Sequence, residues 1–292
     1  MKIYDCTTFH SEHMMMDVRF NALNEHVHKF IVVESLFSHS GEKKKLNFDI
    51  NNYPKFKDKI IYLVIDREPD DLINPLNENI QYKRINSIKR IELSYDFMMS
   101  EIKKLLDNDL IILSDNDEIP NLDSTQFKDS NSDIYIFKQL FFYYKFNLLY
   151  DRMYWFGSKA CTKKKLKSLS WLRNLKNKKY PFWRMDTFFS KTKNSSLKII
   201  NDGGWHFTNV MSAENLYTKM TNFGHHDEFE LSELSVEDLK IKINQGLVFY
   251  DHFAGQEDKN KWEFNYKLKK ISDNLLPDSL IKDKIKLKEW FN

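Results

Sequence analysis

The sequence predicts an α/β fold with a central, mostly parallel sheet flanked by helices. Short β-branched apolar runs recur through the first half of the chain, and segments of helical periodicity separate them. With 292 residues, 41% of them hydrophobic, the chain can bury a large core. In such sheets ligands bind beyond the carboxyl ends of the strands, so the residues that follow each strand are the first candidates for a site.

The expected strands are short, rich in β-branched residues and bounded by polar or turn residues; they lie at residues 29–34, 59–65, 110–114 and 133–137. Apolar residues at helical spacing predict one helix through Met14, Val18 and Ala22, and a longer one from Ile88 to Leu105. Ser235 and Gly246 are typical of a helix start and stop. We expect a main domain of residues 1–255 and a helical extension, residues 256–292, packed on it.

Composition narrows the class of protein. The 45 Lys and Arg residues against 42 Asp and Glu leave a formal charge of +3, too balanced to indicate a nucleic-acid-binding protein. Cys6 and Cys161 lack disulfide or zinc spacing, which favours a reducing compartment. The first residues are too polar for a signal peptide, and the most apolar stretch, residues 134–150, is interrupted by polar side chains. We therefore expect a cytoplasmic protein without a membrane span; the oligomeric state is not readable from the sequence.

The strongest local signal is the segment 110–120, LIILSDNDEIP, in which an apolar strand leads into acids. If the chain stays extended, Asp115 and Asp117 project on the same side. Two such carboxylates repel each other unless a cation lies between them, and their oxygens suit Mg²⁺ or Mn²⁺ carrying a diphosphate. The alternative interpretation is an ordinary acidic loop.

Two further clusters contain residues suited to binding. In residues 202–207, DGGWHF, Trp205 offers a stacking face and His206 is a candidate metal or phosphate ligand, although a tight turn with a core tryptophan would read the same way. In residues 223–229, FGHHDEF, histidines and acids crowd one turn, which is also typical of a solvated helix end.

Several spaced motifs resemble glycosyltransferase family 17, which contains enzymes that add bisecting β-1,4-N-acetylglucosamine to glycoprotein mannose. The resemblance covers residues 1–120 and 200–250 in order. It rests on IYDCTTF (3–9), Glu12, MDVR (16–19), FIVVES (30–35), SHSGEKK (38–44), Arg84 to Arg90, DNDEIP (115–120), GWH (204–206) and the stretch 226–228. Residues 121–183 match the family poorly, and no Golgi-type anchor is visible, which leaves the acceptor open. The lysine-rich stretch 159–180 is interpreted as a mobile or acceptor-facing insertion.

The resemblance implies a GT-A-like fold, a UDP-sugar donor with UDP-N-acetylglucosamine (UDP-GlcNAc) as first candidate, a glycan acceptor, a divalent metal and inversion at the anomeric carbon. The metal ligands would be Asp115, Asp117 and His206, and Trp205 would lie beside the donor. For the catalytic base we expect Glu228 first and Asp186 second. Further donor contacts are expected from residues near strand ends or on the long helix: Asp5, Glu12, Glu34, Arg84 and Arg90. A metal-dependent phosphoester hydrolase and an inactive carbohydrate-binding protein are the rival hypotheses.

Overall fold

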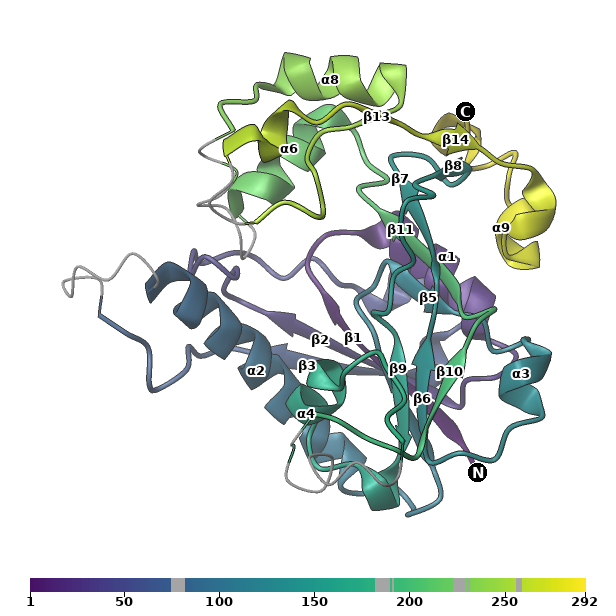
Figure 1. Cartoon of the computed structure of the whole chain (residues 1–292). Coiled ribbons are helices and arrows are strands. Elements are labelled where there is room, and N and C mark those ends of the chain that lie inside the picture. Colours follow the sequence, from purple (N-terminus) through teal and green to yellow (C-terminus); the bar gives the residue numbers. More distant parts are fainter. Residues whose placement is uncertain (75–81, 182–189, 191, 223–228, 230–231, 256–258) are drawn as a thin grey trace.

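The computed structural model describes residues 1–74, 82–181, 190, 192–222, 229, 232–255 and 259–292 (Figure 1). Its centre is a seven-stranded sheet with the order β10-β6-β9-β4-β1-β2-β3. The strands are β1 (Ile3–Phe9), β2 (Lys29–Ser35), β3 (Ile60–Ile65), β4 (Leu110–Leu113), β6 (Ile134–Phe137), β9 (Lys159–Thr162) and β10 (Leu197–Ile200). Only β9 runs antiparallel to its neighbours in this sheet. The predicted α/β class with a central, mostly parallel sheet is confirmed.

Helices cover both faces of this sheet because its strands are apolar on both sides. In β2, Phe30 and Val32 belong to the core that α1 (His13–Leu23) closes. Ile31 and Val33 point the other way, into the core under α2 (Tyr82–Ile102) and α4 (Leu169–Asn174). Both long helices predicted from periodicity are present.

A second, five-stranded sheet stands beside the first, with the order β14-β8-β7-β11-β5. It consists of β5 (Glu118–Pro120), β7 (Leu140–Tyr143), β8 (Leu148–Leu149), β11 (Gly204–Thr208) and β14 (Lys269–Lys270). An aromatic core packs it against α6 (Ala213–Asn222) and α8 (Val236–Gln245). As predicted, Ser235 caps α8, with Asp238 completing a capping box, and Gly246 ends the helix at φ 61°.

The C-terminal segment 259–292 contains strands as well as short helices. Here β13 (Tyr266–Lys267) pairs with β12 (Leu247–Val248), β14 pairs with β8, and α9 (Asp278–Lys282) packs on α1. Remaining elements are α3 (Thr125–Lys128) and short 3₁₀ helices at Ile50–Asn52, Lys57–Lys59, Lys163–Lys165, Lys259–Glu263, Asp273–Leu275 and Lys288–Trp290.

The stretch 159–180 differs from its interpretation as an insertion. Lys159–Thr162 is a buried strand between β4 and β6, and the short helix α4 follows it. The lysine at the start of β9 is only 4% exposed, and its ammonium donates to the carbonyls of Arg173 (2.6 Å) and Leu175 (2.7 Å) at the end of α4. Residues 159–174 are therefore part of the core architecture.

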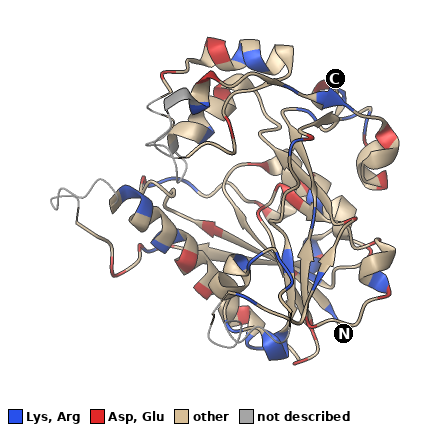
Figure 2. Cartoon of the chain, viewed as in Figure 1, with Lys and Arg blue, Asp and Glu red and all other residues tan. Residues whose placement is uncertain are grey.

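Charges of both signs are interspersed over the molecule (Figure 2), and both cysteines are buried and free. Within the described ranges, no helix has the length and apolar character needed to cross a bilayer.

Candidate active site

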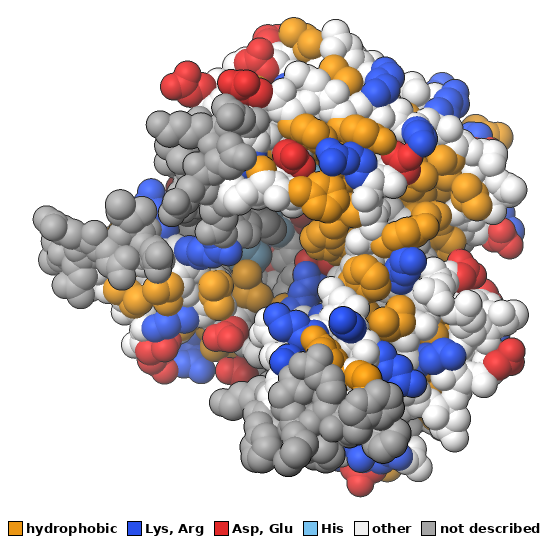
Figure 3. Space-filling model, viewed as in Figure 1, with side chains coloured by type: hydrophobic (Ala, Val, Ile, Leu, Met, Phe, Trp, Pro, Cys, Tyr) orange, Lys and Arg blue, Asp and Glu red, His pale blue; other side chains and the backbone are white. Residues whose placement is uncertain are grey.

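A cleft of about 1010 Å³ opens at the carboxyl ends of β1, β2 and β4, where the topology of the parallel sheet predicts a ligand site (Figure 3). Its walls come from the residues after β1, from α2, from α4, and from the end of β11 with α6. A cleft of this size accommodates a ligand as large as a nucleotide.

The acids after β4 lie on the floor of this cleft, but the chain does not stay extended there. Asn116 and Asp117 form a turn, in which the Glu118 amide donates to the Asp115 carbonyl at 3.1 Å. As a result, Asp115 interacts with α4, whereas Asp117 interacts with β11 and α6. The chain therefore turns where the prediction assumed an extended strand, although Asp115 and Asp117 both line the cleft.

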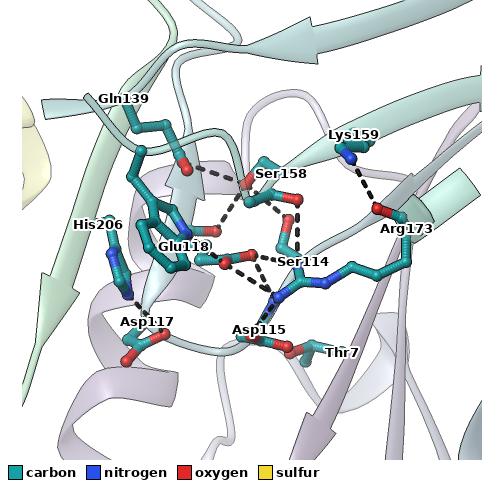
Figure 4. A network of polar contacts seen from close by, with 12 residues as sticks. Thr7, Ser114, Asp115, Asp117, Glu118, Gln139, Ser158, Lys159, Arg173 and His206 are labelled. Carbon is teal, nitrogen blue, oxygen red and sulfur yellow. Dashed lines mark hydrogen bonds and ion pairs between the residues drawn. The ribbon is translucent and has the colours of Figure 1, made fainter. Parts of the chain in front are cut away.

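Arg173 on α4 joins Asp115 to a second acid, Glu118 (Figure 4). Its Nη2 lies 2.6 Å from Asp115 Oδ2, and its Nη1 lies 3.0 Å from Glu118 Oε2. The Asp115 side chain is about 50% exposed, whereas that of Glu118 is fully buried. The planar guanidinium has enough donors to bind both acids at once, so it holds the exposed Asp115 carboxylate against the buried Glu118 carboxylate.

Glu118 is held by three kinds of donor. Besides Arg173, its carboxylate accepts hydrogen bonds from the Trp155 indole (2.6 Å) and the Asp115 backbone amide (2.9 Å). A Cβ at Gly157 would lie 1.8 Å from Glu118 Oε1, so only glycine fits beside the carboxylate. Glu118 thus supports the acidic turn from below without lining the cleft.

Asp117 has its own cationic neighbours. His206 Nε2 lies 3.5 Å from Asp117 Oδ1, and Lys219 Nζ on α6 lies 3.9 Å from Oδ2. The imidazole stacks between Phe141 and Trp155, with centroid distances of 4.8 and 4.6 Å. Its Nδ1 is buried and has no hydrogen-bond partner within the described structure, so Nε2, facing Asp117, is the nitrogen that can engage a partner.

These neighbours set the ionisation of the acids. Burial acts to raise the pKa of Asp117, but His206 and Lys219 outweigh it and lower that pKa to about 2. Burial would also raise the pKa of Glu118, yet Arg173 keeps it below its ordinary value. The pKa of Asp115 is raised to about 6, mainly because the protein around its half-exposed side chain removes part of its hydration. Arg173 opposes this rise, and repulsion from Glu118 adds to it.

Two acids expected to contact the donor have structural partners instead. Asp5 is fully buried and receives both Nε (2.8 Å) and Nη2 of Arg19, which also donates to the carbonyls of Asp115 and Glu118. Glu34 is fully buried as well, and accepts bonds from Lys44, Tyr62 and the backbone amides of residues 47 and 48. Neither carboxylate lines the cleft.

The other expected donor contacts divide into two groups. Glu12 and Arg84 line the cleft, and Glu12 accepts a hydrogen bond from Asn116 at 3.0 Å. Arg90 lines it too, but its guanidinium is paired with Glu68 at 2.8 and 2.9 Å. Trp205 does not line the cleft: it points away from it, and its indole donates to the Leu275 carbonyl at 2.6 Å.

The two candidate bases, Glu228 and Asp186, lie outside the described residues, so both assignments stay predictions. The sequence reasoning missed four residues that the structure brings to the site: Trp155, Arg173, Asn209 and Lys219. Alternation along β11 could have separated Trp205 from His206, whereas the contribution of Arg173 depends on β9 and α4, which the sequence did not predict.

A divalent cation fits this site at Asp117. Its carboxylate borders the cleft, is about 14% exposed and has an imidazole nitrogen 3.5 Å away. Over the described ranges no group of three or more His, Cys, Asp or Glu side chains converges. Magnesium sites on phosphate substrates commonly use one or two carboxylates, with the remaining ligands from phosphate and water. The donor set here matches that pattern.

The fold and cleft define an α/β protein with a site for a nucleotide-sized ligand beside clustered carboxylates. The family model described as Glycosyltransferase family 17 matches residues 1–254. The chain belongs to this family. It is therefore a glycosyltransferase, an enzyme that acts on a donor and an acceptor. The match includes residues 121–183, which the motifs alone did not connect to the family.

No curated protein matches the chain. Among solved structures, it is similar to the inositol-1-phosphate CTP transferase from T. maritima, at 14% identity over 56% of this chain and 71% of that one, with a TM-score of 0.29. It is also similar to HddC from Yersinia pseudotuberculosis complexed with GMP-PN, at 11% identity over 68% of this chain and 89% of that one, with a TM-score of 0.30.

Proposed function

We propose that this protein transfers N-acetylglucosamine from UDP-GlcNAc to a hydroxyl of a glycan acceptor, with inversion and with a divalent cation. One observation carries the proposal: the D-N-D acids of a family 17 chain lie on the floor of a cleft of about 1010 Å³ at the carboxyl ends of β1, β2 and β4. Family membership favours transfer over the rival phosphoester hydrolysis.

The protein's own groups suit the departure of a nucleoside diphosphate. Lys219 and Arg84 both line the cleft and can meet phosphate charge. Asp117, kept ionised by His206 and Lys219, would hold the cation with His206 as a neighbouring ligand. When bound, the cation supplies Lewis-acid stabilisation of the leaving diphosphate.

Orientation is the second contribution of the site. Arg173 and Glu118 fix the Asp115 carboxylate, and the buried Arg19 holds the backbone carbonyls of the same turn. A rigid acidic turn presents its oxygens without reorganisation during the reaction. Removal of the acceptor proton is assigned to Glu228, with Asp186 as the second candidate.

The test is donor binding by titration calorimetry with UDP and UDP-GlcNAc, in Mn²⁺ and in EDTA. We expect both ligands to bind in Mn²⁺, and to bind at least tenfold more weakly in EDTA or in the Asp117→Asn variant. Asp123→Asn is the matched control, because that exposed acid pairs with Lys128 away from the cleft. Equal affinity for UDP in EDTA would remove the metal from the proposal, and failure of both ligands to bind in Mn²⁺ would refute the donor.

A further inference from the structure

Asn209, the residue directly after β11, combines four properties. Its backbone is left-handed, with φ 57°, and the residue is only 6% exposed. It lines the cleft. Its side-chain amide makes no hydrogen bond to any described part of the chain, although its backbone carbonyl accepts one from Met211 at 2.9 Å.

Two of these properties, the amide without a partner in the described chain and the left-handed backbone, point to a ligand. A carboxamide offers two donor hydrogens and an acceptor oxygen, and at Asn209 no described group of the chain uses them, so they are open to a ligand in the cleft. Left-handed backbone at a residue other than glycine adds strain, which asparagine tolerates best, and such strain gathers at ligand sites. A ligand that both donates and accepts hydrogen bonds would satisfy the amide.

The position of Asn209 indicates which part of a ligand it meets. The amide of Phe207 donates to the carbonyl of Asp117 at 2.8 Å, so the end of β11 is tied to the acidic turn. Asn209 follows two residues later, about 7 Å along the chain. Val210 and Met211 line the cleft beside it and add apolar surface. A sugar attached to a diphosphate at Asp117 would lie within reach of the amide.

We propose that the Asn209 side chain binds a polar substituent of the transferred sugar, either a ring hydroxyl or the acetamido group. This inference rests on the proposed function, because it requires a nucleotide-sugar donor with its diphosphate at Asp117. Asn209 is then a specificity-determining residue that contacts the sugar and leaves the nucleotide untouched.

The experiment compares dissociation constants for UDP, UDP-glucose and UDP-GlcNAc in Mn²⁺, using wild type, Asn209→Gly and Asn209→Asp. Glycine keeps the left-handed backbone without the amide, and aspartate keeps the size and the backbone without the N–H donors. Glu233→Gly is the control, because Glu233 also has a positive φ of 54° but does not line the cleft.

We expect affinity for UDP to stay within twofold in both variants, and affinity for UDP-GlcNAc to fall about tenfold relative to UDP. A fall for UDP-GlcNAc alone identifies the acetamido group, and an equal fall for UDP-glucose identifies a shared hydroxyl. An unchanged ratio in both variants, or an equal loss for UDP itself, overturns the inference. Wild-type protein that binds none of the three refutes the proposed function instead.

Discussion

The contact between Gly157 and Glu118 allows a sharp test of how the acidic turn is supported. In Gly157→Ala the added methyl carbon would lie 1.8 Å from Oε1 and 2.4 Å from Oε2 of Glu118, so the carboxylate must move. It cannot move alone, because Trp155, Arg173 and the Asp115 amide all donate to it. Overpacking costs about 1–3 kcal/mol, and each charge-assisted hydrogen bond that breaks adds a further 1.5–3 kcal/mol.

We therefore expect Gly157→Ala to lower the free energy of unfolding by about 3–5 kcal/mol, measured by urea denaturation at 25 °C. Gly255→Ala is the control: no atom of the described residues lies within 4 Å of its added Cβ, and its effect should stay within about 0.5 kcal/mol. Shortening the acid in the double variant Gly157→Ala, Glu118→Asp should recover part of the loss. If the free energies of unfolding of Gly157→Ala and Gly255→Ala differ by less than about 1 kcal/mol, the Glu118 carboxylate and its hydrogen bonds do not stabilise the acidic turn.

Two further predictions concern buried ionisable groups. Asp5→Asn leaves the fully buried Arg19 without its carboxylate, so the free energy of unfolding should fall by about 3–5 kcal/mol in urea denaturation, and a loss below 1 kcal/mol would show that Arg19 is not held by charge. Burial lowers the pKa of His252 to about 3. Its ring is hydrogen-bonded to the Tyr143 hydroxyl, and the ionisable groups that act on it are His206, Asp251 and Lys261. Since its unfolded pKa is about 6.5, the unfolded state binds the proton first, and stability falls from pH 6.5 downward by roughly 1–2 kcal/mol at pH 5. His252→Gln should lack this component when denaturation at pH 7 and pH 5 is compared, and an identical pH dependence would contradict the assignment.

Much of the fold could be predicted because its signals are local. The strands β2, β3, β4 and β6 are short apolar runs, and α1 and α2 carry apolar residues at helical spacing. The start and end of α8 follow from two side chains, Ser235 and Gly246, that act within one turn. Strand β9 gave no such signal, because its sequence, KACT, has no run of large apolar side chains and begins with a lysine whose charge is satisfied by the end of α4.

The candidate site was predictable in position but not in detail. The D-N-D acids could be placed at a strand end, and the cleft is there. The roles of Asp5 and Glu34 depend on Arg19 and Lys44, which meet them only after the chain folds. A buried structural carboxylate and a ligand-binding carboxylate look the same in sequence. The cation that pairs with a structural carboxylate can lie far from it along the chain, so the pair is visible only in the folded protein.

The C-terminal segment shows that the edge of a family match need not be the edge of a folding unit. The match ends at residue 254, yet Trp290 lines the cleft and the backbone of Asn292 is bonded to the side chain of Asn147 at 2.9 and 3.1 Å. A protein engineer who trimmed the chain to the matched region, or exchanged its last residues for those of a relative, would alter one wall of the cleft. Residues beyond the matched region therefore help to decide what the cleft of this protein admits.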